Sequence, residues 1–253
     1  MVMLYCLEFD SSTPGLPTTM FIESTKQSTK AEVEDYFNNI GFDRWRRIYS
    51  DSQEINSVQR NIRAGHQKTV NQALGWICER GDLKQLSFCD AGCGVGSIAL
   101  PLVQMGARFV SASDISKSMV TEARYRSEAL DVDKERITFF TSDLENLTGC
   151  FDTVLCLDVL IHYPQEAAEV MVQHLCSLAN ETLIVSFAPY TPLLAMLKGI
   201  GKLFPGSSKS TRAYTLREKG IVLAALNCGF KQVRCSFNQA PFYFSRLIEF
   251  RRC

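Results

Sequence analysis

The sequence has few of the residues that would indicate a metal centre, a membrane span or a nucleic-acid binder. It contains only three histidines, and none of its ten cysteines forms a Cys-x-x-Cys pair, so neither a histidine-rich site nor a zinc motif is expected. Basic and acidic side chains both number 27, which leaves no basic excess of the kind that a dedicated nucleic-acid binder carries. No apolar run reaches the length of about 18 residues that a membrane-spanning helix requires. The scattered cysteines are expected to be small buried hydrophobic residues in a reducing compartment.

The first 29 residues resemble neither common kind of leader. They lack the long apolar core and small-residue cleavage site of a signal peptide. Plastid transit peptides are poor in acids and contain arginine, whereas this stretch has Glu8, Asp10 and Glu23 and no arginine. We expect residues 1–29 to form a disordered arm.

From residue 86 onward, short apolar runs alternate with helical patterns, which indicates an α/β domain with helices on both faces of a doubly wound sheet. The expected strands are 86–90, 107–113, 136–142, 152–157, 182–188, 230–237 and 242–250. The expected helices are 96–105, 116–130, 165–179 and 215–227. Since no helix separates the last two strands, we expect an antiparallel hairpin at the end of a mostly parallel, seven-stranded sheet.

The segments before and within this domain suggest two additions. A capping box at Thr29–Glu32 predicts a helix to about Ile40, and a longer helix is expected from about 54 to 80. Residues 30–81 are therefore predicted to form an N-terminal helical cap on a domain of residues 82–253. Prolines and an amphipathic stretch at 189–214 interrupt the alternation, and we expect an inserted substrate lid there.

The strongest local signal is a glycine loop between the first strand and its helix. Asp90 is followed by Gly92, Gly94 and Gly96, and glycine allows a backbone to approach a ligand closely. A dinucleotide fingerprint would place its third glycine at position 97, where this chain has Ser97. The acid before the loop suits a ligand's ammonium group better than a pyrophosphate.

Acids also follow the next two strands. Asp114 ends the second strand, and its two oxygens can accept hydrogen bonds from both hydroxyls of a ribose. Asp143 follows the third strand. A loop of the form Asp-x-Gly-x-Gly-x-Gly with these two acids resembles motif I and its neighbours in class I methyltransferases that use S-adenosylmethionine (SAM). That resemblance implies a Rossmann-like domain in which Asp143 lies near the adenine amino group.

Several further stretches resemble a narrower family. They are Gly-Phe-Asp-Arg-Trp-Arg-Arg-Ile-Tyr at 41–49, Cys-Leu-Asp-Val-Leu-Ile-His-Tyr-Pro at 156–164, Ser-Phe-Ala-Pro at 186–189, Thr-Arg-Ala-Tyr at 211–214 and Phe-Tyr-Phe-Ser-Arg-Leu at 242–247. Together with the glycine loop they make residues 30–251 similar to the magnesium-protoporphyrin IX methyltransferase family of chlorophyll synthesis. The resemblance implies methyl transfer from SAM to a propionate of magnesium-protoporphyrin IX, which gives the monomethyl ester.

The resemblance also implies partners and a location. Magnesium-protoporphyrin IX is the expected substrate, the large porphyrin-binding subunit of magnesium chelatase is an expected partner, and no nucleic acid is expected. The implied location is a plastid or a cyanobacterial cytoplasm, with part of the protein associated peripherally with thylakoid or envelope membranes.

Tyr49 and His162 are the catalytic candidates. A propionate with a pKa near ~4–4.5 is already ionised at neutral pH, so a neutral hydrogen-bond donor that orients its oxygen is more useful than a strong base. Tyr49 and His162 could each supply such a donor. His162 could instead be an axial ligand of the substrate's magnesium.

The remaining candidates fall into two groups, and no protein-bound metal is expected because the magnesium belongs to the substrate. The candidates for SAM binding are Asp90, Gly92, Gly94, Gly96, Asp114, Ile115, Asp143, Leu144, Leu157, Tyr36, Arg60 and His66. The candidates for binding the macrocycle and its propionates are Trp45, Arg212, Tyr214, Tyr243 and Arg246.

Three other interpretations use the same motifs. A quinone or phenol O-methyltransferase would share every cofactor motif. A nicotinamide enzyme is disfavoured by Ser97 and Asp90. A non-catalytic regulatory protein of methyltransferase fold would not need the intact acids and glycines of the loop.

Overall fold

A mixed sheet forms the centre of the computed structural model, which describes residues 30–49, 55–191 and 213–253. The seven strands are β1 (Ser87–Ala91), β2 (Phe109–Asp114), β3 (Ile137–Thr141), β4 (Phe151–Cys156), β5 (Ala179–Phe187), β6 (Phe230–Ala240) and β7 (Tyr243–Arg252). Their order is β3-β2-β1-β4-β5-β7-β6. The first five strands run parallel, whereas β7 pairs antiparallel with both β5 and β6. The fold class predicted from the alternation of strands and helices is confirmed.

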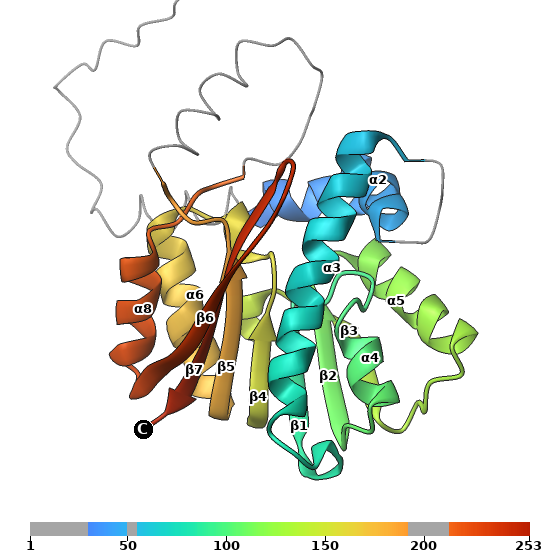
Figure 1. Ribbon diagram of the computed structural model, residues 1–253. Coiled ribbons are helices and arrows are strands. Elements are labelled where there is room, and N and C mark those ends of the chain that lie inside the picture. The colour runs from blue at the N-terminus through green and yellow to red at the C-terminus, as the bar shows by residue number, and fades with distance from the viewer. Residues whose placement is uncertain (1–29, 50–54, 192–212) are drawn as a thin grey trace, which may run out of the picture.

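Helices cover both faces of the sheet, as Figure 1 shows. The α-helices are α2 (Ile40–Ile48), α3 (Ser57–Cys78), α4 (Ala99–Gln104), α5 (Lys117–Ala129), α6 (Gln165–Leu178) and α8 (Glu218–Leu226), and residues 30–38 are also helical. Short 3-10 helices lie at Leu83–Gln85, Leu144–Asn146 and Leu160–His162. One hydrophobic cluster joins α3, α4 and α5 to the sheet, and a second joins α6 and α8 to its other face.

Helix α3 begins at a capping box. The Asn56 side chain accepts a hydrogen bond from the Gln59 backbone at 2.9 Å, and the Gln59 side chain accepts one from the Asn56 backbone at 3.2 Å. These bonds satisfy two of the backbone donors that every helix start leaves open. Val70 and Ile77 from this helix are buried in the same cluster as α4, so α3 is fixed on the sheet. Its N-terminal half extends beyond the strand ends (Figure 1).

Several expected bounds differ from the structure: β5 begins at Ala179 and not at 182, α8 begins at Glu218 and not at 215, and two further differences lie near the site. The helix after the glycine loop begins at Ala99 and not at 96, because Gly96 has a φ of +85° and no helix can pass through that conformation. Residues 41–48 are helical as part of α2, which begins at Ile40, where the preceding helix was expected to end, and Tyr49 is the C-cap residue of α2. Thr29 and most of the predicted lid lie outside the described residues.

The cysteines divide between core and surface. Cys89, Cys93, Cys156 and Cys176 are buried as expected. The expectation is wrong for another group of four, because these lie at the ends of elements or on the outer strand: Cys78, Cys150, Cys235 and Cys253.

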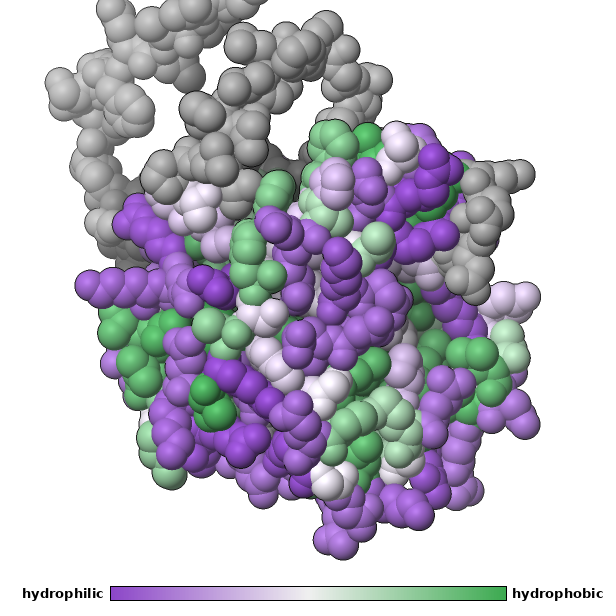
Figure 2. All heavy atoms as spheres, viewed as in Figure 1, coloured by the Kyte–Doolittle hydropathy of each residue, from purple (hydrophilic) through white to green (hydrophobic). Residues whose placement is uncertain are grey.

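The outer surface of the described residues carries no long apolar helix. None of these helices has the length and hydropathy needed to cross a bilayer. On the face drawn in Figure 2, hydrophobic residues form separate groups between hydrophilic ones. One group lies over α8, where Leu223 and Leu226 are 45% and 44% exposed.

Candidate active site

The glycine loop folds back over the end of β2. The backbone N–H groups of Gly92 and Cys93 both donate to the Ser113 carbonyl at 2.8 Å. Gly92 has a φ of +86°, and a Cβ atom there would lie 2.2 Å from Cγ2 of Val159. Only glycine fits this position, because both the backbone conformation and the space exclude a side chain. The loop therefore leaves a bare backbone at the carboxyl ends of the parallel strands, where open α/β sheets bind ligands.

Asp90 supplies a buried acceptor beneath this loop. It is 1% exposed, and its Oδ2 atom has no hydrogen-bond partner among the described residues. Burial, aided by the negative charge of Asp114, raises the pKa of Asp90 to about 8. A buried acceptor without a partner is costly unless a ligand provides a donor, so this carboxyl group fits a cationic ligand group such as the ammonium of SAM.

Asp114 is held by the backbone on both sides. Its Oδ2 accepts from the Gly94 N–H at 2.9 Å, and its Oδ1 accepts from the Ser116 N–H at 2.8 Å. Burial raises the pKa of Asp114 to about 6 against the effect of these two bonds. Each carboxylate oxygen retains a lone pair, so the fixed group can still receive two ribose hydroxyls.

A largely apolar pocket of about 440 Å³ lies in front of these acids. This volume is in the range of small-molecule sites. The predicted SAM-binding residues that line it are Asp90, Gly92, Gly94, Asp114, Ile115, Leu144, Leu157 and His66. The predicted catalytic and substrate-binding residues that line it are Tyr49, His162, Trp45, Tyr214 and Tyr243.

Some predicted residues do not line this pocket. The side chain of Asp143 pairs with Lys30, and that of Arg246 pairs with Glu218 at 2.9 Å. The Tyr36 hydroxyl accepts from the Trp45 indole at 3.2 Å, and Arg60 donates to the Ile55 carbonyl at 3.3 Å. Gly96 turns the backbone without reaching the lining, and Arg212 lies outside the described residues.

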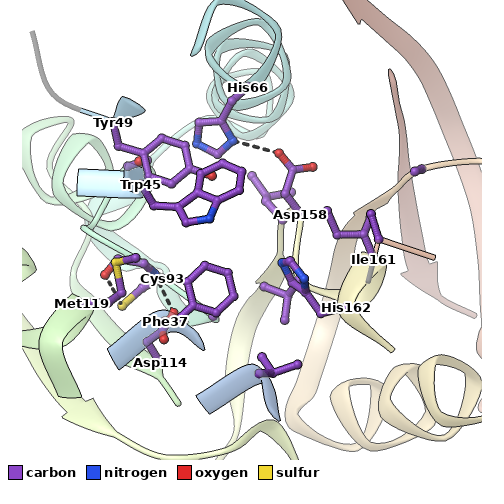
Figure 3. Close-up of a pocket in the computed structure, with 18 of the residues that line it drawn as sticks. Phe37, Trp45, Tyr49, His66, Cys93, Asp114, Met119, Asp158, Ile161 and His162 are labelled. Atoms are coloured by element: carbon purple, nitrogen blue, oxygen red, sulfur yellow. Dashed lines mark hydrogen bonds and ion pairs between the residues drawn. The ribbon is translucent and has the colours of Figure 1, made fainter. Parts of the chain in front are cut away.

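Aromatic rings from α2 and the preceding helix form one wall, shown in Figure 3. The rings of Trp45 and Tyr49 stack with centroids 5.4 Å apart, and Tyr49 lies 4.5 Å from the His66 ring. Arg63 and Arg126 hold the end of α2 by donating to the carbonyls of Ile48 and Tyr49, at 2.7 and 2.6 Å. Burial and the charge of Asp158 raise the pKa of Tyr49, so its hydroxyl keeps its proton and remains a donor.

His162 closes the opposite side of the pocket. Its ring meets Phe37 edge-on at 5.1 Å. Burial lowers the pKa of His162 to about 4, although the charge of Asp158 opposes the shift. The ring is therefore neutral at physiological pH and can donate a hydrogen bond without adding a positive charge.

Asp158 is the polar centre that the sequence reasoning missed. It has a φ of +58°, which is unusual for a residue other than glycine. Its carboxylate contacts His66 Nδ1 at 2.8 Å and accepts from the hydroxyls of Tyr243 at 2.7 Å and Ser186 at 2.8 Å. Burial acts to raise the pKa of Asp158, but the bond and charge of His66, with the two hydroxyls, lower it below its usual value. The sequence signal that could have identified Asp158 is its position as an acid directly after the fourth strand.

Phe242 and Phe244 were also missed as site residues. Both line the pocket from the tip of the β6–β7 hairpin. Phe242 has a φ of +65° and is 68% exposed. Both residues belong to the stretch 242–247 already singled out, but the tight turn between two paired strands is what brings Phe242 to the pocket.

Comparisons with known proteins agree with this geometry. The family model described as magnesium-protoporphyrin IX methyltransferase C-terminus matches residues 156–252, and a general methyltransferase domain matches residues 88–181. Magnesium-protoporphyrin O-methyltransferase of Synechocystis sp. is 51% identical over 87% of this chain and 95% of its own length. The chloroplastic magnesium protoporphyrin IX methyltransferase of Arabidopsis thaliana is 49% identical over 87% of this chain and 70% of its own length.

Solved structures agree as well. The crystal structure of the magnesium protoporphyrin IX methyltransferase from Synechocystis PCC 6803 with bound SAH has a TM-score of 0.82 at 50% identity, covering 88% of this chain and all of the other. The same enzyme with bound SAM has a TM-score of 0.78 at 45% identity, covering 89% and 97% of the two chains. The predicted resemblance is thus confirmed, and the chain belongs to the magnesium-protoporphyrin IX methyltransferase family.

Proposed function

We propose that this chain transfers the methyl group of SAM to a propionate carboxylate of magnesium-protoporphyrin IX and so forms the monomethyl ester in chlorophyll synthesis. The observation that carries this proposal is the buried Oδ2 of Asp90, which lacks a partner among the described residues, beneath a glycine loop at the mouth of an aromatic pocket. Bound SAM supplies an electrophilic methyl group on a sulfonium. The close relatives are named for the same activity.

The acids at the strand ends would hold the cofactor. Asp90 would pair with its ammonium group, because the carboxyl is buried and raised in pKa. Asp114, fixed by two backbone N–H groups, would receive the ribose hydroxyls. Leu144 and Ile115 would cover the base with apolar surface. Asp143 already forms an ion pair with Lys30. To accept a hydrogen bond from the adenine amino group as well, its carboxylate would have to serve both partners.

Tyr49 and His162 would orient the attacking carboxylate. His162 is buried and Tyr49 is half-buried, and the pKa shifts of both favour the neutral form. A neutral donor fixes the propionate oxygen without withdrawing as much electron density as an arginine would. The apolar lining excludes water, which strengthens these polar contacts. Trp45, Tyr214 and Tyr243 line the pocket and would offer ring surface to the macrocycle.

A direct assay tests the function. Purified protein is incubated with methyl-labelled SAM and magnesium-protoporphyrin IX, and the labelled ester is separated by chromatography. Quinones and phenols of similar size serve as alternative acceptors. Label in the porphyrin ester supports the proposal, whereas label only in a phenol or quinone product would replace it with another O-methyltransferase activity.

The proposed location and partners rest on the relatives and the resemblance. The relatives come from a cyanobacterium and from chloroplasts, so we propose that this chain works in one of these compartments. We also propose contact with the porphyrin-binding subunit of magnesium chelatase and partial, peripheral association with photosynthetic membranes. Co-sedimentation with thylakoid-lipid vesicles, with and without the purified subunit, measures both. A protein that stays in the supernatant in each case contradicts them.

A further inference from the structure

His66 lines the pocket and has a buried, unpartnered ring nitrogen. The residue is 8% exposed, and its Nε2 atom has no hydrogen-bond partner among the described residues. The other ring nitrogen, Nδ1, lies 2.8 Å from Oδ2 of Asp158. Figure 3 shows the ring projecting from α3 between the Asp158 carboxylate and the Tyr49 ring. The His66–Asp158 contact joins α3 to the end of β4.

The surroundings of Asp158 decide which nitrogen carries the proton. The Asp158 carboxylate accepts from the Tyr243 and Ser186 hydroxyls, so both of its oxygens already act as acceptors. Nδ1 of His66, 2.8 Å from Oδ2, is then the donor of this contact. An imidazole with its single proton on Nδ1 carries a lone pair on Nε2.

A lone pair in the pocket does not fit an ionised propionate, because both groups are acceptors. It fits an electron-pair acceptor, and the substrate of the proposed function brings one in its magnesium, whose axial position is outside the plane of the macrocycle. We propose that Nε2 of His66 is an axial ligand of the substrate's magnesium and that Asp158 is the positioning residue that fixes its tautomer. This inference rests on the proposed function. It adds a physical reason why the protein would bind magnesium-protoporphyrin IX in preference to metal-free protoporphyrin.

Magnesium prefers oxygen ligands, so a free imidazole would compete poorly with water. Two features of this site favour the imidazole. A carboxylate on the far nitrogen raises the basicity of a histidine ligand and fixes its orientation, and the burial of His66 limits access of water to its ring. Of the three histidines in the sequence, His174 does not line the pocket and lies 3.0 Å from the Leu147 carbonyl.

The first experiment uses the unaltered protein. With only three histidines, ¹⁵N-histidine labelling gives few imidazole signals, which His66→Ala and His162→Ala assign. Magnesium-protoporphyrin IX should move the Nε2 signal of His66 while its Nδ1 keeps its proton. Metal-free protoporphyrin should leave the Nε2 signal in place. An equal shift with both porphyrins, or a metal-dependent shift of His162 alone, overturns the proposal.

The second experiment measures affinity by porphyrin fluorescence. His66→Ala should weaken binding of magnesium-protoporphyrin IX roughly 10- to 100-fold, the range seen when metal-ligand partners are lost, and should change binding of metal-free protoporphyrin less than about two-fold. Asp158→Asn should also weaken binding of magnesium-protoporphyrin IX, but less than His66→Ala does. The amide can donate a hydrogen bond to Nδ1 and so move the proton of the ring to Nε2. Added imidazole should restore the magnesium-porphyrin spectrum of His66→Ala. The matched control is His174→Ala, expected to bind both porphyrins as the unaltered protein does.

The outcomes separate the two proposals. If the unaltered protein methylates magnesium-protoporphyrin IX but His66→Ala weakens both porphyrins equally, only the axial role fails. If it does not methylate that porphyrin, the proposed function itself fails. SAM affinity and circular dichroism of each variant show that the fold is intact.

Discussion

The two sides of the pocket are built in different ways. On the cofactor side, Asp90, the glycine loop and Asp114 lie within 25 residues of one another, and the backbone N–H groups of Gly94 and Ser116 hold Asp114. On the acceptor side, Asp158 contacts His66 and Tyr243, which are 92 and 85 positions away. The first side is visible in the sequence as a motif, whereas the second exists only after α3, β4 and β7 have come together.

The two sides also treat charge differently. The acids of the cofactor side have raised pKa values, about 8 for Asp90 and about 6 for Asp114, because burial dominates. The acid of the acceptor side, Asp158, has a lowered pKa despite its burial, because His66 and two hydroxyls surround it. The acids of the cofactor side therefore need a cationic ligand group as a partner, whereas Asp158 on the acceptor side already has its partners within the fold.

His162→Ala should produce the largest effect and should be confined to the acceptor side. Loss of one orienting hydrogen bond in an active site lowers turnover roughly 10²- to 10³-fold. SAM affinity, measured by calorimetry, should remain within about two-fold. Because the pKa of His162 is lowered to about 4, its contribution should be constant from pH 6 to 9. Unchanged turnover would remove His162 from the reaction, and loss of SAM affinity would show that the two sides are not separable.

Gly92→Ala should destabilise the protein where the glycine loop of the cofactor side contacts Val159, which follows Asp158 of the acceptor side. The new Cβ would combine a positive φ with a contact of 2.2 Å to Val159, and strain and overpacking together cost roughly 3 kcal/mol of unfolding free energy. Gly94→Ala is the matched control, since Gly94 also has a positive φ but no atom within 4 Å of a new Cβ. It should lose only about 1 kcal/mol. Urea unfolding without ligand measures both, and equal losses would show that Val159 moves aside.

Much of the fold could be predicted because its signals are local. Strand–helix alternation gave the seven strands, and the lack of a helix between the last two gave the antiparallel hairpin. The start of α4 was placed three residues early, because a glycine in the first turn does not reveal the sign of its φ. Helix α2 was missed, since its arginines at 44, 46 and 47 mask a short apolar face and its end is held by Arg63 and Arg126 from elsewhere.

The candidate site divides in the same way. Asp90 and Asp114 were expected at strand ends and line the pocket. Asp158 was overlooked although it stands in a motif already singled out, because its importance comes from partners that no local pattern specifies. Arg246 was expected at the substrate, but β7 turns it toward Glu218.

The raised pKa of Asp90 gives a smaller effect, specific to the cofactor side. At pH 7 a carboxyl with a pKa of about 8 is mostly protonated, so pairing with an ammonium group should release up to about one proton. SAM affinity should rise with pH between 6 and 7.5 by at most tenfold per unit, about 1.4 kcal/mol. Calorimetry in buffers of different ionisation enthalpy measures the proton release.

The matched variant is Asp90→Asn, which should bind SAM more weakly and with neither proton release nor pH slope. The stability of the unliganded protein should depend on pH with the opposite sign. Because its folded pKa is raised, Asp90 stabilises the unliganded fold most below the unfolded value near 4, and this contribution is lost as pH rises toward 8. An affinity that does not change with pH would show that Asp90 is already ionised before SAM binds.

Arg246→Ala should have the smallest effect, although the sequence suggested a substrate role. Its guanidinium pairs with Glu218 at 2.9 Å and does not line the pocket. A partly exposed ion pair of this kind contributes about 0.2–1 kcal/mol to stability, and turnover should stay near that of the unaltered protein. Glu218→Gln, which breaks the same pair from the other end, should lose a similar amount of stability. If Arg246→Ala instead raised the KM for the porphyrin while Glu218→Gln did not, Arg246 would leave Glu218 to meet a propionate, and the acceptor side would extend to the outer strands.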